Sequence, residues 1–205
     1  MKINLKTTPV IYINMDKDVN RNESMKDLIN EFGFTKHFRS SGTYTPGDSL
    51  KGCATSHNNI LSSIKSKAII LEDDCVIKNN ISTIEVPDDA DAVYLGLSEW
   101  GYTKDVSKLG NFKFEMVNGY PGVYKVNGML ATHAILYISK EYIKMCERVA
   151  EYSSKNSVHV DQGFARIQRY FNVYAIADPI FYQHSNTEAT NIKFVKDRII
   201  QNRHA

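Results

Sequence analysis

The feature that most constrains the fold of this chain is an apolar run at residues 68–71, followed at once by Glu72, Asp73 and Asp74. A short apolar run bounded by polar residues indicates a buried strand. Side chains at the C-terminal end of such a strand lie where open α/β sheets bind ligands, in the crevice beyond the strand tips. The three carboxylates therefore predict a ligand site at one edge of a sheet.

The spacing of these acids suggests a metal site. In an extended backbone alternate side chains share a face, so we expect Glu72 and Asp74 to converge on one point while Asp73 faces away. Two carboxylates on one side suit Mg²⁺ or Mn²⁺ and leave coordination positions free for substrate phosphates. Such an ion neutralises a diphosphate leaving group, as a sugar-nucleotide enzyme requires. The alternative is a solvated acidic turn.

Strands and helices alternate in the first half of the chain. Residues 9–14 and 37–39 have the composition of strands, and Gly33 is placed to end the helix between them. Two amphipathic helical faces are expected, one with Met25, Leu28, Ile29 and Phe32, the other with Cys53, His57, Ile60, Leu61 and Ile64. This alternation predicts an α/β fold with a Rossmann-like, mostly parallel central sheet flanked by helices.

The second half is less regular. Residues 79–91 are polar and indicate a connector, residues 92–95 and 133–138 indicate strands, and residues 111–126 contain short β-like pieces. Ser139 can cap the helix that follows, and residues 172–176 are expected to form the last strand. No linker or repeat interrupts the chain. We therefore expect a single domain over 1–205, with a nucleotide-binding half at about 1–100 and an acceptor half at about 101–205.

The charge, the cysteine content and the apolar segments of the chain exclude several classes of protein. The net charge is +2, and basic and acidic residues are intermixed, so no nucleic-acid footprint stands out. The three cysteines, Cys53, Cys75 and Cys146, show neither a disulfide framework nor a zinc pattern, which favours a reducing compartment. The sequence shows no signal-peptide core and no apolar stretch of membrane-spanning length. We expect a cytoplasmic protein without a membrane span.

Six segments, in this order, resemble family-25 (lipopolysaccharide-type) glycosyltransferases over roughly residues 10–192. They are the first strand with Asn14 and Arg21, residues 52–57 with a Ser-His pair, the acidic motif 71–74, residues 132–139, Asp161, and residues 183–185. The sequence after Gln183 departs from the family motif, and the chain is short for the family. The small glycosyltransferase domains of large algal DNA viruses are a second resemblance, which would place the protein in a host cytoplasm.

Both resemblances imply a GT-A fold that uses a divalent metal, Mn²⁺ or Mg²⁺. They imply a hexosyltransferase with a nucleotide diphosphate sugar, most simply a UDP sugar, as donor and a saccharide or glycoprotein as acceptor. Under this resemblance Asp74 is the foremost metal ligand. Glu72 would bind the metal through water or hold the ribose, and Asp73 joins it in donor binding. His184 would complete the metal shell as a neutral imidazole; its alternative is an exposed loop histidine.

Polar residues at the ends of the first two strands should flank the nucleotide crevice. These are Asn14, Arg21, Arg39 and Ser41. Arg39 could offer its planar fork to phosphate or stack on a base, or it could pair with a surface carboxylate. Tyr12 could stack on uracil, although strand alternation favours the core.

Two further sites come from the helices. Ser56 and His57 are expected on a helix that borders the donor sugar; the alternative for His57 is burial on that helix's apolar face. Asp161 is the candidate general base if the reaction inverts the anomeric centre, and it would orient the sugar if configuration is retained. As an alternative, Asp161 is only a helix-start acid that interacts with the dipole. Trp100 could stack on a sugar or serve packing.

Three functions remain open from the sequence. The leading one is a metal-dependent glycosyltransferase. A Mg²⁺-dependent phosphotransferase or phosphatase is the second, although neither an aspartyl-nucleophile pattern nor a phosphate-cradling glycine loop with its lysine is present. The third is a catalytically inactive sugar-nucleotide-binding module.

Overall fold

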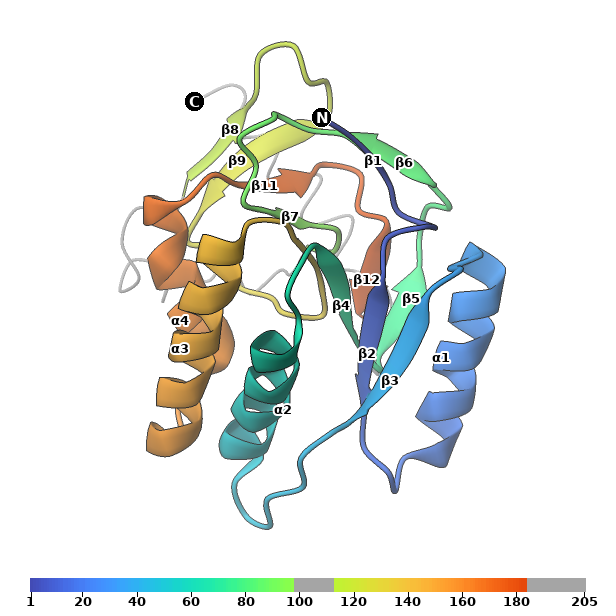
Figure 1. The fold of residues 1–205 in the computed structure, drawn as a ribbon, viewed down its shortest axis with the longest axis vertical. Coiled ribbons are helices and arrows are strands. Elements are labelled where there is room, and N and C mark those ends of the chain that lie inside the picture. Colours follow the sequence, from blue (N-terminus) through green and yellow to red (C-terminus); the bar gives the residue numbers. More distant parts are fainter. Residues whose placement is uncertain (98–112, 184–205) are drawn as a thin grey trace.

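The protein is an α/β structure built on one large sheet, seen in a computed structural model that describes residues 1–97 and 113–183 (Figure 1). The strand order is β3-β2-β4-β10-β7-β11-β9-β8. Their bounds are β2 (Val10–Asn14), β3 (His37–Ser41), β4 (Ala68–Glu72), β7 (Ala92–Tyr94), β8 (Lys113–Met116), β9 (Val123–Asn127), β10 (Ala134–Tyr137) and β11 (Val173–Ile176).

The sheet is mostly parallel, as predicted. Strands β3, β2 and β4 pair in parallel, and so do β7 and β11. Strand β10 is antiparallel to both β4 and β7, and β9 is antiparallel to β11 and β8. Only β10 and β9 therefore run against the other strands of this sheet.

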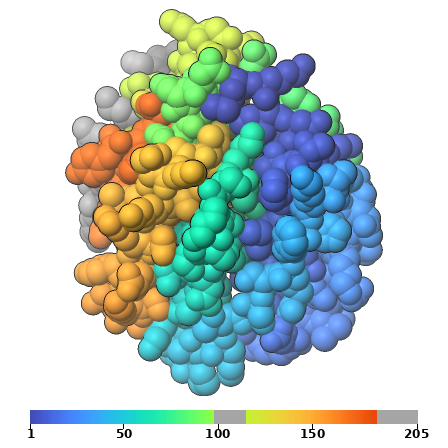
Figure 2. All heavy atoms as spheres, viewed as in Figure 1, coloured from blue at the N-terminus to red at the C-terminus, as the bar shows by residue number. Residues whose placement is uncertain are grey.

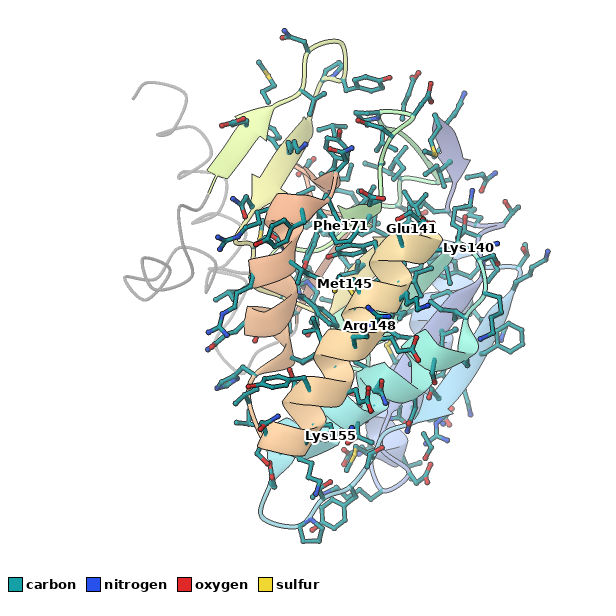
Figure 3. The ribbon with its side chains drawn as sticks, turned by 60° about the vertical axis from the view of Figure 1, so that its left-hand side comes forward. Lys140, Glu141, Met145, Arg148, Lys155 and Phe171 are labelled. Atoms are coloured by element: carbon teal, nitrogen blue, oxygen red, sulfur yellow. The ribbon has the colours of Figure 1, made fainter. Side chains whose placement is uncertain are left out.

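Helices α1 to α4 of the described residues cover the two faces of the sheet (Figure 1). Helix α1 (Val19–Phe32) lies on one face. Helices α2 (Ser49–Ser63), α3 (Lys140–Asn156) and α4 (Val160–Ile167) lie on the other, and a 3₁₀ turn (Gln168–Tyr170) follows α4. Figure 2 shows α2 and α3 as adjacent bands across the front of the molecule, with the segment that precedes α2 at its lower edge. Helix α4 packs beside α3, whose labelled side chains in Figure 3 include Lys140, Arg148 and Lys155.

The strands are buried on both sides, so the core has two parts. On the α1 face, Met25, Leu28, Ile29 and Phe32 pack with alternate strand residues such as Ile69 and Leu71. On the α2–α4 face, the intervening residues, including Ile70, pack with the apolar sides of the three helices. Burial on both faces explains why residues 68–71 form an uninterrupted apolar run.

Local signals placed two helix ends correctly. Gly33 adopts a φ of +82° and its N–H bonds to Ile29 O, which ends α1 as expected. The Ser139 side chain accepts a hydrogen bond from the Tyr142 N–H at the start of α3. Tyr12 is 4% exposed, which confirms its placement in the core, and its hydroxyl bonds to Asn22.

Two short strand pairs correct the expected secondary structure of residues 79–91 and the expected position of the last strand. Strand β1 (Lys2–Asn4) pairs with β6 (Thr83–Glu85), so the segment 79–91 is more than a connector. Strand β5 (Cys75–Ile77) pairs with β12 (Phe181–Gln183), so residues 172–176 are not the last strand. Strands of three residues are too short to show a period in sequence.

Among the described residues, no helix is long and apolar enough to cross a membrane. The single-domain boundaries and the cytoplasmic location stay predictions.

Candidate active site

A cavity of about 330 Å³ lies at the carboxyl ends of β2, β3 and β4. Because these three strands are parallel, the loops that follow them meet at one edge of the sheet, the lower edge in Figure 1. The loop after β3 and the first turns of α2 form the opposite wall. The cavity is lined by Ile13, Asn14, Met15, Lys17, Arg21, Gly42, Thr43, Tyr44, Thr45, Ser49, Gly52, Cys53, Ser56, His57, Glu72, Asp73 and Asp74.

All three carboxylates of the acidic motif line this cavity. Strand β4 ends at Glu72, and Asp73 and Asp74 form a turn. The alternation of faces therefore stops at Glu72, and the expectation that Asp73 faces away is wrong. The three acids thus lie at the sheet edge beside a cavity, where the apolar run predicts them, while ligand binding there stays a prediction.

Asp73 belongs to a network that ties β4 to the loop after β2. Its Oδ2 accepts a hydrogen bond of 2.8 Å from Asn14 Nδ2, and its Oδ1 accepts one of 2.8 Å from the half-exposed Arg21. The Arg39 guanidinium donates to Asn14 Oδ1 at 3.0 Å and to Asp16 Oδ1 at 2.6 Å. Asp73 is thus held by two partners that also line the cavity.

Two predicted donor-site residues lie outside the cavity wall. The Arg39 side chain is engaged by Asn14 and by Asp16, so the alternative interpretation, pairing with a surface carboxylate, describes it better. The Ser41 hydroxyl and Arg39 together lower the pKa of Asp16. Both residues support the strand ends rather than form the cavity surface.

His57 and Glu72 form a buried pair. His57 is 1% exposed, and its Nε2 lies 3.1 Å from Glu72 Oε1. Burial opposes a charge on either group, yet their interaction, with Cys53 beside the ring, raises the pKa of His57 to about 10 and keeps the pKa of Glu72 below its ordinary value. His57 is therefore buried on its helix and also lines the cavity, while its predicted place beside a donor sugar stays a prediction.

Of the three acids in the motif, Asp74 has an oxygen whose hydrogen-bonding capacity is not used by the described residues. Its Oδ2 accepts a hydrogen bond of 2.8 Å from Gln183, whereas its buried Oδ1 has no hydrogen-bond partner within the described part of the chain. Burial, and then the charge of Glu72, raise the pKa of Asp74 to about 6. A buried carboxylate oxygen without a partner is a suitable ligand for a divalent cation.

The described acids nevertheless do not form a complete metal shell by themselves. Within residues 1–97 and 113–183, the ligand atoms that gather within 4.8 Å of one another belong to Cys53, His57 and Glu72, not to the three acids of the motif. The predicted ligand His184, like Trp100, lies outside the described residues. The metal-ligand role of Asp74 stays a prediction.

Ser56 supports the cavity rather than presenting a free hydroxyl. Its Oγ donates to Gly52 O and accepts from the Thr43 N–H, each at 2.8 Å. This bond fastens the loop after β3 to α2. The end of the second strand was expected to flank the crevice, but Thr43, further along this loop, was not singled out in sequence.

That loop carries Tyr44, which sequence reasoning missed. Its ring is 64% exposed, and Lys17 Nζ lies 4.6 Å from the ring centroid. An exposed aromatic ring beside a cation at the mouth of a cavity is suited to stack on a planar, anionic ligand.

Asp161 lies near this site but does not line the cavity. It is in the first turn of α4, where its Oδ1 accepts a hydrogen bond of 2.7 Å from the Gln162 N–H. Burial raises the pKa of Asp161, and the charge of Glu72 adds to the effect. Phe164 of the same helix packs edge-on against the His57 ring at 6.1 Å between centroids, so α4 borders the site from the far side of α2.

His133 packs inside the fold. It is 1% exposed, and burial lowers its pKa to about 4. The ring packs so closely on Gly96 that a Cβ at that position would lie 2.0 Å from His133 Nε2.

The fold places this chain beside solved GT-A-type structures. No protein-family model and no curated protein matches it. The crystal structure of a glycosyltransferase involved in the glycosylation of the major capsid of PBCV-1 is similar, with a TM-score of 0.52 at 9% identity, over 95% of this chain and 99% of that one. This likeness confirms the fold class and shows the fold alone.

Two further structures are more distant. The glycosyltransferase GlyE of Streptococcus pneumoniae TIGR4 has a TM-score of 0.47 at 7% identity, over 96% of this chain and 65% of its own. A nucleoside-diphosphate-sugar pyrophosphorylase from Vibrio cholerae RC9 has a TM-score of 0.45 at 14% identity, over 84% of this chain and 73% of its own. Neither is close enough to guide the assignment of residues.

Proposed function

We propose that this protein is a glycosyltransferase that moves a sugar from a nucleotide diphosphate sugar to a saccharide or glycoprotein acceptor, with Mn²⁺ or Mg²⁺ as cofactor. The observation that carries the proposal is Asp74 Oδ1, a buried carboxylate oxygen without a described partner, in a cavity at the carboxyl edge of parallel strands. A UDP sugar is the proposed donor. Membership of family 25 rests on the order of the sequence motifs and stays a prediction.

Asp74 and the neighbouring Glu72 would hold the divalent ion, with His184 as a further candidate. When bound, the ion would neutralise charge on the departing diphosphate. The preference for Mn²⁺ or Mg²⁺ follows from the hard oxygen of Asp74. The raised pKa of Asp74 supports this role, since a carboxylate that resists ionisation alone gains most from a cation.

The opposite wall supplies the proposed nucleotide contacts. Tyr44 would stack on the base, and Lys17 beside it would meet negative charge on the ligand. Arg21 is half-exposed and lines the cavity, so it can reach a phosphate while Asp73 holds it in place. The cavity volume lies within the range of small-molecule sites.

Asp161 is the proposed group on the acceptor side. Its raised pKa makes it a better proton acceptor than an ordinary aspartate, as a general base requires. In a retaining reaction the same residue would orient the acceptor sugar.

The test is turnover of a panel of nucleotide sugars. With Mn²⁺ present, we expect release of the nucleotide from one donor, fastest for a UDP sugar, and loss of release in EDTA. Asp74→Asn should abolish release, whereas Asp27→Asn, an exposed carboxylate on α1, should not. Release of inorganic phosphate from a nucleotide, without sugar transfer, would instead support the phosphatase alternative.

A further inference from the structure

Three chemically different ligand groups meet on the α2 side of the cavity. Cys53 and His57 are four residues apart on α2, so their side chains share one face of the helix. Glu72, the last residue of β4, reaches the same point from the sheet. The Cys53 sulfur, a His57 ring nitrogen and a Glu72 carboxylate oxygen all lie within 4.8 Å of one another.

The His57 ring lies beside both other groups. Its Nε2 faces Glu72 Oε1, and the Cys53 side chain lies next to the ring on the same helix. An ion bound at Nε2 would take the place of the proton that the ring and the carboxylate now share.

The spacing suits a tetrahedral ion. Zinc lies about 2.0–2.2 Å from nitrogen and oxygen ligands, so two such ligands at a tetrahedral angle are about 3.3 Å apart. His57 Nε2 and Glu72 Oε1 are 3.1 Å apart. A shell with three protein ligands leaves one position open, as in catalytic rather than structural zinc sites. All three residues line the cavity, so the open position would face it.

We propose that Cys53, His57 and Glu72 form a binding site for a thiophilic divalent ion of the zinc class, with its fourth position open to the cavity. This site goes beyond the proposed function. It shares Glu72 with the proposed Mn²⁺ or Mg²⁺ position at Asp74, but it adds a thiolate and an imidazole, which select softer ions than carboxylates do. The cysteine spacing alone shows no zinc pattern. The third ligand is 15 residues beyond His57 in sequence, and only the fold brings it into place.

Cobalt titration tests the proposal, because the absorption spectrum of bound Co²⁺ depends on the type and number of its ligands. Metal-free protein without nucleotide should develop a thiolate-to-cobalt charge-transfer band and the strong visible bands of tetrahedral Co²⁺, and Zn²⁺ should remove both. In Cys53→Ser the charge-transfer band should disappear, and Zn²⁺ affinity measured by competition should fall about a hundredfold or more. The exposed-face variant Asn59→Ser on the same helix should behave like wild type.

Other spectra would overturn the proposal. Weak octahedral bands that are equal in wild type and Cys53→Ser would place the ion on oxygen ligands alone. A charge-transfer band that persists in Cys53→Ser would assign the thiolate to another cysteine. Glu72→Gln adds a second test, since it should retain the sulfur band but weaken Zn²⁺ binding. Mn²⁺-dependent UDP binding by Asp74→Asn is a separate readout that bears on the proposed function only, because Asp74 is not a ligand of this site.

Discussion

At the residue scale, the ionised form of Asp74 should destabilise the fold. Its pKa is raised from 3.8 to about 6, so between these pH values the folded protein binds more protons at this residue than the unfolded chain does. Stability should therefore fall as pH rises through this window, by about 1–3 kcal/mol in total. The penalty is then fully present above about pH 6.

The corresponding prediction is that Asp74→Asn stabilises the protein above that window. Urea unfolding should show a gain of about 1–2 kcal/mol near neutral pH, and the gain should vanish below pH 3.8. Asp27→Asn, the matched change at an exposed carboxylate, should alter the free energy of unfolding by less than about 0.5 kcal/mol. A loss of stability in Asp74→Asn at neutral pH would contradict this description of the carboxylate.

Ionisation of Asp74, which should lower the stability of the fold, should strengthen metal binding. Mn²⁺ needs the ionised carboxylate, so the affinity for Mn²⁺ should rise as pH increases through about 6. Calorimetric titrations at several pH values, each in two buffers, would also show the release of protons on binding. An affinity that does not change across this window would remove Asp74 from the proposed metal shell.

Asp161 allows the acceptor side to be tested separately from the cavity. Since it does not line the cavity, Asp161→Asn should leave the affinity for UDP and Mn²⁺ near wild type. Sugar transfer should fall about a hundredfold or more if this residue is the general base. A weaker acceptor affinity with unchanged kcat would instead indicate a positioning role. Wild-type rates and affinities would leave it as a helix-start acid only.

At the element scale, the close approach of α2 to the loop after β3 shapes the cavity. A Cβ on Gly52 would lie 2.6 Å from Thr43 O, a backbone atom that cannot move without the loop. Gly52→Ala should therefore displace Tyr44 and weaken nucleotide binding about tenfold or more, although alanine itself favours the helix. Asn59→Ala, on the exposed side of α2, is the control. Unchanged UDP affinity in Gly52→Ala would show that this loop does not contact the nucleotide.

The long elements could be predicted from sequence because each repeats its signal. Helix α1 shows its apolar face and its terminal Gly33, and β4 combines an apolar run with polar boundaries. The pairs β1–β6 and β5–β12 could not be predicted, since three-residue strands show no period and depend on partners far along the chain. The β5–β12 pair matters to the site because it brings Gln183 to Asp74.

The residues of the candidate site were likewise predictable only where a local sequence pattern marks them. The acids were predicted because they follow a recognisable strand, and parallel strands bring Asn14 and Arg21 to the same edge. The engagement of Arg39 by Asp16 and the meeting of Cys53 with Glu72 depend on contacts between elements, which no local pattern encodes. Asp73 was misplaced because the strand geometry was extended through Asp73 and Asp74, which form a turn.

At the scale of the whole molecule, the parallel part of the sheet carries the cavity and α4 approaches it from the second half of the chain. The described architecture thus separates a proposed donor side, on β2, β4 and α2, from a proposed acceptor side, on α4. A ligand that binds only the folded state raises stability with its concentration, so nucleotide binding can be followed by thermal unfolding of the whole protein.

The most direct measurement is the thermal shift caused by UDP with Mn²⁺ and with EDTA, in wild type, Asp74→Asn and Asp27→Asn. We predict that UDP raises Tm in wild type and Asp27→Asn only when Mn²⁺ is present, and leaves Tm unchanged in Asp74→Asn. An equal UDP shift in EDTA, or a wild-type shift in Asp74→Asn, would contradict the claim that this cavity binds a nucleotide through a metal held by Asp74.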